Sequence, residues 1–125
     1  MKKINITEQN WVEAAGYKKQ LLLSDKELRC DGTRVQMVVM PPHSTIENHY
    51  HKTSREFYYV LQGGCLLTIN DETLRLAVGD MLLTEPDEVH RLINDGNEEF
   101  KLLVFKTNAT PEDTYWSDTF GHPAD

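Results

Sequence analysis

His49 and His51, separated by a single residue, are the side chains of this sequence best suited to chemistry. On a β-strand, residues two apart project from the same face, so both imidazoles can approach one ion. A chain with five histidines produces this spacing by chance often enough that exposed or hydrogen-bonded histidines are a real alternative. The neighbouring residues decide between the two interpretations.

Glu56 and His90 extend the pair to a set of four candidate ligands. Glu56 begins a strongly predicted strand, and a tight reversal over residues 52–55 would return it alongside His51. His90 follows a turn in another predicted strand, where a neighbouring strand of the same barrel could supply a fourth ligand. Three imidazoles and one carboxylate suit one divalent first-row transition metal, either Fe, Mn, Ni, Co, Cu or Zn. The sequence predicts such an ion on His49, His51, Glu56 and His90.

Short strands separated by turns must position these residues. Runs rich in β-branched, aromatic and leucine residues are broken at close spacing by Gly, Asn, Asp and Pro, which is typical of an all-β domain. The predicted strands span residues 20–23, 35–40, 46–51, 56–62, 66–70, 73–78, 81–84, 89–93 and 100–107. One short helix is predicted over residues 7–15, with Thr7 as its N-cap and Gly16 at its end.

The length of the chain, 125 residues, predicts a single domain over residues 1–125. We expect a core barrel over about residues 20–107. A polar tail over residues 108–125 follows it, and we expect this tail to wrap the barrel through Tyr115, Trp116 and Phe120, with no role assigned to it.

The composition narrows the choice of partners. A net charge of −7, from 13 basic and 20 acidic residues, opposes binding to nucleic acid or anionic lipid, because both need clustered Lys and Arg. The basic start is followed by polar residues rather than an apolar signal sequence, and the longest apolar runs are too short to cross a bilayer. We therefore predict a cytoplasmic protein with a small-molecule ligand or substrate and with no nucleic-acid or membrane partner.

The spacing of the candidate ligands resembles the first of the two motifs of the cupin superfamily. That motif reads glycine, five residues, HxH, three or four residues, glutamate, six residues, glycine. His49, His51, Glu56 and Gly63 stand at those spacings, and His43 takes the place of the leading glycine.

The second cupin motif runs from a glycine to a histidine eleven residues later and an asparagine four beyond. Gly79, His90 and Asn94 match it. Pro86 lies one place late, and Asp87 occupies an inner glycine position, so we expect a different conformation for the turn before His90.

The resemblance covers about residues 42–94 and implies a jelly-roll β-barrel of the small single-domain cupin type, with the four metal ligands inside. Such cupins include dioxygenases, sugar isomerases and epimerases, lyases, decarboxylases and binding modules. We expect a metal-dependent enzyme that acts on a small polar metabolite by dioxygenase-like or Lewis-acid isomerase or lyase chemistry. Whether it is an enzyme stays open. The alternatives are a non-enzymatic ligand-binding or sensor domain and a barrel with a purely structural metal.

Residues that share a strand face with the ligands are expected to line the pocket, namely Tyr58, Val60, Gln62, Leu92 and Asn94. For Tyr58, a place in the core is an equal alternative. We expect His43 to support the site rather than bind the metal, and His122 to be solvated. Three arginines could clamp an anionic group of a substrate, and the sequence singles out none of them: Arg34, Arg75 and Arg91.

Two predicted strands are apolar on both faces, over residues 56–61 and 100–105. A strand of this kind needs cover on both sides. The outer cover could be the N-terminal segment or a second subunit. We predict a homodimer, because an exposed aromatic patch usually marks an interface.

Overall fold

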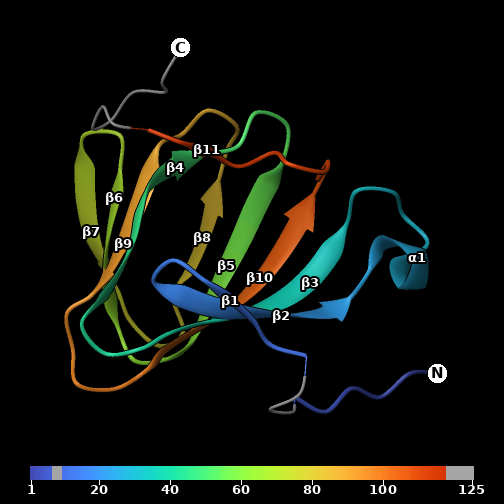
Figure 1. Cartoon of the computed structure of the whole chain (residues 1–125), viewed down its shortest axis with the longest axis horizontal. Coiled ribbons are helices and arrows are strands. Elements are labelled where there is room, and N and C mark those ends of the chain that lie inside the picture. The colour runs from blue at the N-terminus through green and yellow to red at the C-terminus, as the bar shows by residue number, and fades with distance from the viewer. Residues whose placement is uncertain (7–9, 118–125) are drawn as a thin grey trace.

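The computed structural model describes residues 1–6 and 10–117 of the chain. These residues contain eleven strands and one short helix. The strands form two antiparallel sheets that face each other (Figure 1). The six-stranded sheet has the order β1 (Val12–Ala14), β2 (Tyr17–Leu23), β3 (Arg34–Met40), β10 (Phe100–Thr107), β5 (Arg55–Gln62) and β8 (Met81–Thr84). The five-stranded sheet has the order β11 (Tyr115–Trp116), β4 (Ser44–Tyr50), β9 (His90–Asn94), β6 (Cys65–Ile69) and β7 (Glu72–Leu76).

From β3 to β10 the chain passes back and forth between the two sheets. The all-β jelly roll predicted from the sequence is therefore confirmed. Strands β8 and β10 have the predicted bounds, and the other predicted strands are displaced by one to three residues at one or both ends. The helix α1 (Asp25–Leu28) has four residues, and within the described ranges no helix is long and apolar enough to cross a membrane.

The helix predicted over residues 7–15 is wrong where the structure describes the chain. Val12–Ala14 form β1, which pairs with β2 as an antiparallel hairpin. Gly16 lies in the turn of this hairpin at φ 88°, and a Cβ at that position would lie 1.9 Å from the carbonyl oxygen of Thr45. The glycine that suggested a helix end therefore closes a tight turn between strands. Thr7, the predicted N-cap, lies outside the described residues.

Apolar side chains fill the space between the sheets. Met40, Cys65, Leu67 and Phe100 are fully buried in one contiguous cluster. Full burial of a large apolar side chain stabilises the fold by about 1.5–3 kcal/mol. The cluster extends from Phe100, where β10 begins, to Tyr58 and Val104, which adjoin the polar residues at the other end of the barrel.

The tail crosses the open end of the barrel, at the top of Figure 1. After β10 the chain leads to β11, which pairs with β4 so that Tyr115 lies opposite Tyr50 and Trp116 opposite His49. The tail therefore packs on the barrel as far as residue 117. Phe120 and His122, for which we made predictions, lie outside the described residues.

The outer face of the six-stranded sheet leaves large apolar side chains exposed, among them Tyr59, Leu61, Leu83 and Phe105. Because β1 lies beside β2 at the sheet edge, the hairpin extends the sheet instead of covering this face. The physical basis for a second subunit thus remains, and the homodimer stays a prediction. The single domain over residues 1–125 stays a prediction as well.

Candidate metal centre

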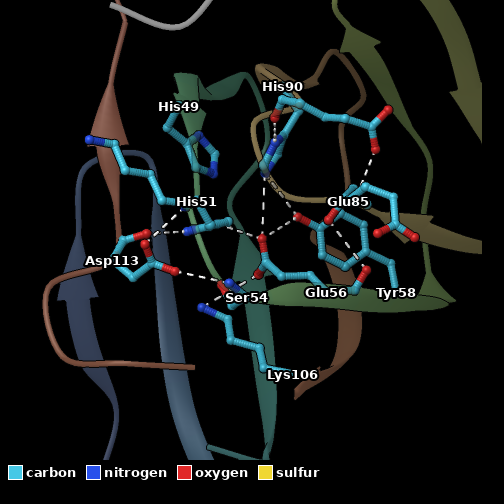
Figure 2. Close-up of polar contacts among 12 residues, drawn as sticks. His49, His51, Ser54, Glu56, Tyr58, Glu85, His90, Lys106 and Asp113 are labelled. Carbon is cyan, nitrogen blue, oxygen red and sulfur yellow. Dashed lines mark hydrogen bonds and ion pairs between the residues drawn. The ribbon is translucent and has the colours of Figure 1, made fainter. Parts of the chain in front are cut away.

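Four buried side chains converge between the two sheets at one end of the barrel (Figure 2). His49 belongs to β4, His51 directly follows it, and His90 begins β9, where it lies opposite His49. Glu56 comes from β5 in the facing sheet. One ligand atom from each of the four lies within 4.8 Å of all the others. The structure therefore brings together all four residues singled out by their spacing.

This separation suits a single ion. Ligand atoms that lie about 2.1 Å from one ion can be no more than about 4.2 Å apart. The observed limit of 4.8 Å leaves an adjustment of well under an ångström, which side-chain rotation can supply. The donor set, three imidazoles and one carboxylate, is one that first-row transition metals bind.

Each of the three histidines is held by a backbone carbonyl group. The Nδ1 atoms of His49, His51 and His90 lie 2.7, 2.8 and 2.9 Å from carbonyl oxygens. A carbonyl oxygen only accepts, so Nδ1 must carry the proton and donate it. A neutral imidazole of this tautomer has its lone pair on Nε2, the atom directed into the cluster. Carbonyl groups of this kind orient the histidines of metal sites.

His51 supplies the test of whether a cation fits. Its Nε2 atom is buried and has no hydrogen-bond partner among the described residues, although it lies 2.6 Å from Oε1 of Glu56. With the proton on Nδ1, both atoms present lone pairs to each other. Such a buried pair is stable only when a cation, either a proton or a metal ion, binds both. The residues present therefore fit a metal ion.

The electrostatics of the cluster favour the protonation states that metal binding needs. Burial, together with the nearby His90, lowers the pKa of His49 to about 3, so this imidazole is neutral. Burial raises the pKa of Glu56, but it is outweighed by hydrogen bonds from His51 and His90, when a proton takes the place of the metal ion on their Nε2 atoms, and by the ammonium group of Lys106. The pKa of this carboxyl group is held well below its usual range.

Tyr58 and Lys106 contact Glu56 from two sides (Figure 2). The Tyr58 hydroxyl donates to Oε1 of Glu56 at 3.2 Å and lies 3.2 Å from Nε2 of His90. Burial and the nearby Glu56 raise the pKa of Tyr58 well above its usual value, so the hydroxyl keeps its proton. Nζ of Lys106 lies 3.5 Å from Oε2 of Glu56. Sequence reasoning missed Lys106, although alternation along β10 places it on the inner face with Leu102 and Val104.

Asp113 in the tail supports the site from outside. Its carbonyl oxygen accepts the Nδ1 hydrogen of His51. Its carboxylate accepts hydrogen bonds from the backbone N–H groups of Lys52, Thr53 and Ser54 and from the Thr53 hydroxyl. The tail therefore fixes both the ring of His51 and the reversal that brings Glu56 back to it. No periodic pattern marks such a contact in the sequence.

A cavity of about 60 Å³ adjoins the cluster. Of the five residues predicted to line it, Tyr58 and Leu92 do so, together with His49, His51 and Glu56. Further lining residues, which the sequence did not predict for the pocket, include Tyr17, Lys19, Gln36, Lys106, Thr114 and Trp116.

The other three predicted lining residues lie away from this cavity. Val60 is buried in the apolar core. Gln62 donates to the carbonyl oxygen of Glu99. The amide of Asn94 donates to the carbonyl oxygens of Met40, Pro41 and Glu98. Alternation along the strands predicted the face of these side chains but not their depth along the barrel. None of the three therefore lines this cavity.

The two motif positions that lack glycine keep a glycine-like backbone. His43 has φ 56° and Asp87 has φ 68°, both in the left-handed region that glycine favours. The sequence alone suggested that Asp87 alters the turn before His90, but its backbone lies in the region open to glycine. The N–H of Asp87 donates to the carbonyl oxygen of His51 at 2.7 Å, which ties this turn to the metal ligands. His43 contacts Asn97 and is not part of the ligand cluster.

The three arginines have different surroundings. Arg75 forms a two-point ion pair with Asp95, and Nε of Arg91 lies 3.3 Å from a carboxylate oxygen of Glu47. Arg34 lines a second hollow that shares His51 with the cavity.

Known proteins have sequences and folds similar to those of this chain. The sequence matches the family model for the Cupin domain over residues 36–106. An uncharacterised protein of Methanocaldococcus jannaschii is 35% identical over 65 residues, which cover 52% of this chain and 52% of that protein. The polyketide synthase CurC of Streptomyces cyaneus is 32% identical over 76 residues, 61% of this chain and 49% of that protein. The chain thus spans about half the length of these two relatives.

Two further similarities involve Thermotoga maritima. Its oxalate-binding protein is 28% identical over 83 residues, which cover 66% of this chain and 69% of that protein. The crystal structure of a predicted oxalate decarboxylase from the same organism has a TM-score of 0.68 and 26% identity, covering 74% of this chain and 80% of that one.

A structure with lower identity matches more of the fold. The Cupin 2 conserved barrel domain protein of Salinispora arenicola has a TM-score of 0.75 at 17% identity, and the match covers 87% of this chain and 90% of that one. The family model, which covers more than half of the sequence, and the matching barrels lead to one conclusion: the chain belongs to the cupin domain family.

Proposed function

We propose that this chain binds one divalent first-row transition metal through His49, His51, Glu56 and His90 and is a metal-dependent enzyme for a small polar metabolite. One observation carries the proposal. Three buried imidazoles expose Nε2 lone pairs to one ionised carboxylate, directly beside a cavity. A closed structural metal would need no such cavity, which favours a site that receives a ligand.

The side chains around the cavity define what the protein would do to a bound metabolite. A metal ion in this site would act as a Lewis acid or redox centre toward oxygen atoms of the substrate. Tyr58 holds a proton at its hydroxyl oxygen, 3.2 Å from Glu56, and its raised pKa suits donation of a hydrogen bond better than loss of the proton. Trp116 lies against His49, with ring centroids 5.2 Å apart, and covers the cavity from the tail side.

Binding without turnover is the second candidate function. The relative from Thermotoga maritima is named an oxalate-binding protein, and a small dicarboxylate has oxygen atoms that can bind a metal at two points. In that case the barrel would hold the metabolite, and a partner protein would report its presence.

The wider setting of the protein is also a proposal. We infer a homodimer formed by the outer face of the six-stranded sheet, supported by the exposed apolar side chains there, and a cytoplasmic location, supported by the composition. Sedimentation measures the oligomeric state, and a monomer at all concentrations would contradict the dimer.

Elemental analysis tests the metal centre. Protein purified without added metal, or loaded with Fe, Mn, Ni, Co, Cu or Zn, is expected to hold one ion per chain, and His51→Ala is expected to lose it. The matched control is His43→Ala, which removes an imidazole outside the cluster and should retain the ion. Equal metal content in both variants would show that the ligands are elsewhere.

Turnover distinguishes the two candidate functions. The Fe-loaded protein is screened for dioxygen uptake with diols and diketones, and the other metal forms are screened for isomerase and lyase products. Substrate consumption supports the enzyme. Tight binding of a metabolite that is recovered unchanged from every metal form supports the binding module instead.

A further inference from the structure

We propose that Lys19, Arg34 and Lys106 form a subsite for an anionic oxygen group, a carboxylate or a phosphate, of the ligand that the metal holds. The inference deepens the proposed function and rests on it for the metal-bound end of the ligand. The fold places these three positive charges close together without giving each one a carboxylate partner.

Three neighbouring strands direct these cations to the open end of the barrel. Arg34 begins β3 and lies directly opposite Lys106 of β10, and Lys106 lies opposite Glu56 of β5. Like charges on directly opposed residues of antiparallel strands destabilise a sheet. Lys19 of β2 joins them, since the charges of Lys106 and Arg34 contribute to lowering its pKa. Desolvation by burial is the larger cause of that shift.

The cations have few acidic partners. Lys106 is 3.5 Å from Glu56, and its side chain is only 15% exposed. Among the residues that the structure describes, Lys19 and Arg34 form no ion pair with any carboxylate. Of the three carboxylates at this end, those of Glu56, Glu112 and Asp113, only Glu56 contacts one of the cations. The same carboxylate would also be a metal ligand, so a bound divalent ion would compete with Lys106 for its charge.

Two adjacent hollows share lining residues here. Lys19, His51, Lys106 and Thr114 line both the cavity beside the metal ligands and a second hollow of about 260 Å³. Arg34 lines the second hollow. A ligand with one end in the cavity could therefore direct its other end between the three cations without leaving the barrel mouth.

Two acidic residues, Glu112 and Asp113, also line the second hollow and are the nearest candidates for counter-charges there. The carboxylate of Asp113 is engaged by the backbone N–H groups of residues 52–54 and the Thr53 hydroxyl. Glu112 is exposed and forms no ion pair with a described residue. Neither forms an ion pair with Lys19 or Arg34, so within residues 1–6 and 10–117 these cations lack a carboxylate partner, and an anionic group of the ligand would supply one.

Three probes that share a carboxymethyl end test the subsite. Malonate carries a second carboxylate, phosphonoacetate carries a phosphonate in its place, and malonamate carries a neutral amide of similar shape. Affinities are measured by calorimetry on metal-loaded protein. We expect malonate or phosphonoacetate to bind at least about tenfold more tightly than malonamate, because each adds charge-assisted hydrogen bonds to the cations. Whichever of the two binds better identifies the group as carboxylate or phosphate.

Lys19→Gln and Arg34→Gln are the test variants, because neither side chain forms an ion pair with Glu56, the one carboxylate among the proposed metal ligands. Each should reduce the preference for the dianionic probe by about tenfold, with little change for malonamate. The matched control is Lys101→Gln, which removes the same charge from β10 at the end of the strand remote from the metal ligands. It should leave all three affinities unchanged.

Metal content and thermal stability are measured first in every variant. Metal-loaded protein that binds the charged and neutral probes equally, or variants that keep the full preference, would overturn the subsite and leave the metal centre intact. Wild-type protein that takes up no metal would contradict the proposed function. The charged and neutral probes are then compared on the metal-free protein, where equal binding of both would also overturn the subsite.

Discussion

The two ends of the barrel share the same strands and differ in what they bury. Along β10 the inward residues are Phe100, Leu102 and Val104, all buried and apolar, and then Lys106. Six residues of strand correspond to about 20 Å. One end is therefore a close-packed apolar core, and the other holds four potential ligands and a group of cations.

The apolar end stabilises the fold, and the polar end holds the side chains that would bind the metal and its ligand. Burial of apolar surface is favourable without any partner. Burial of Glu56 and three imidazoles is unfavourable unless another charge compensates. We infer that the apolar end carries the stability and allows the other end to keep a polar cluster that a metal would complete. The following predictions test this division from the largest expected effect to the smallest.

Phe100→Ala should produce the largest loss of stability. The side chain is fully buried, and removal of a buried phenyl ring costs about 3–5 kcal/mol in free energy of unfolding. Urea unfolding measures this change, and the metal affinity of the folded protein should stay the same. Phe105→Ala on the same strand is the control. Its ring is 37% exposed on the outer face, so it should cost about 1 kcal/mol. Equal losses would contradict the division between inner and outer faces.

Metal binding should stabilise the polar end. A ligand present at one hundred times its dissociation constant raises the free energy of unfolding by about 2.7 kcal/mol. Thermal unfolding with and without the preferred metal measures this shift, and a chelator should reverse it. Glu56→Gln, which keeps the shape and removes the charge, should abolish it. Glu47→Gln on the outer, exposed part of β4 should not. A shift that survives in Glu56→Gln would place the metal elsewhere.

The sequence predicted the polar end better than the depth of the pocket. Local spacing grouped His49, His51 and Glu56, because residues two apart share a strand face and a tight reversal can return the chain beside them. His90 joined this group mainly through the resemblance to the cupin motifs. The same alternation predicted a pocket position for Asn94. That residue shares the face of His90 but lies four residues further along β9, about 13 Å away, where its amide ties the apolar end together. Alternation specifies a face and carries no information on depth.

Contacts between segments that lie far apart in the sequence also could not be predicted. Asp113 has no periodic pattern around it, and its carboxylate reaches the reversal before Glu56 across about sixty residues of sequence. The helix predicted at the N-terminus failed for a related reason. The segment Val12–Ala14 is short, and its pairing with β2 outweighs a local helix preference. Only the tertiary structure shows either contact.

Asp113 should make stability at the polar end depend on pH. Burial raises the pKa of this carboxyl group, but hydrogen bonds from the Thr53 hydroxyl and from the N–H groups of residues 52–54 outweigh it and lower the pKa to about 2 from an ordinary 3.8. Because the folded-state pKa lies below the unfolded-state value, the carboxylate contributes its full stabilisation above about pH 4. That contribution is lost as the pH falls through about 2.

Asp113→Asn isolates this contribution from those of other acids. The free energy of unfolding is measured for both proteins from pH 5 down to pH 2.5, and the difference between them should shrink as the pH falls. At pH 5 the variant should be about 1–3 kcal/mol less stable, since it weakens four buried or part-buried hydrogen bonds to this carboxylate. A difference that does not change with pH would show that the charge of Asp113 is unimportant.

The smallest effects should come from the two left-handed turns, which lie at opposite ends of the barrel. A residue other than glycine at positive φ is strained by about 1–2 kcal/mol, while glycine adds entropy to the unfolded chain. Asp87→Gly and His43→Gly should therefore each change stability by less than about 1 kcal/mol. Asp87→Val and His43→Val should each destabilise the fold by about 1–2 kcal/mol, because a β-branched side chain is poorly tolerated there.

Metal affinity separates the two turns where stability does not. The N–H of Asp87 donates to the carbonyl oxygen of His51, so a shift of this backbone in Asp87→Val displaces a metal ligand and should weaken metal affinity several-fold. His43 contacts Asn97 instead, and His43→Val should leave metal affinity unchanged at the same loss of stability. Competition with a chromogenic chelator measures both affinities. If both valine variants weaken metal affinity to the same extent, the two ends of the barrel are coupled through the strands. The assignment of stability to one end and metal binding to the other would then be wrong.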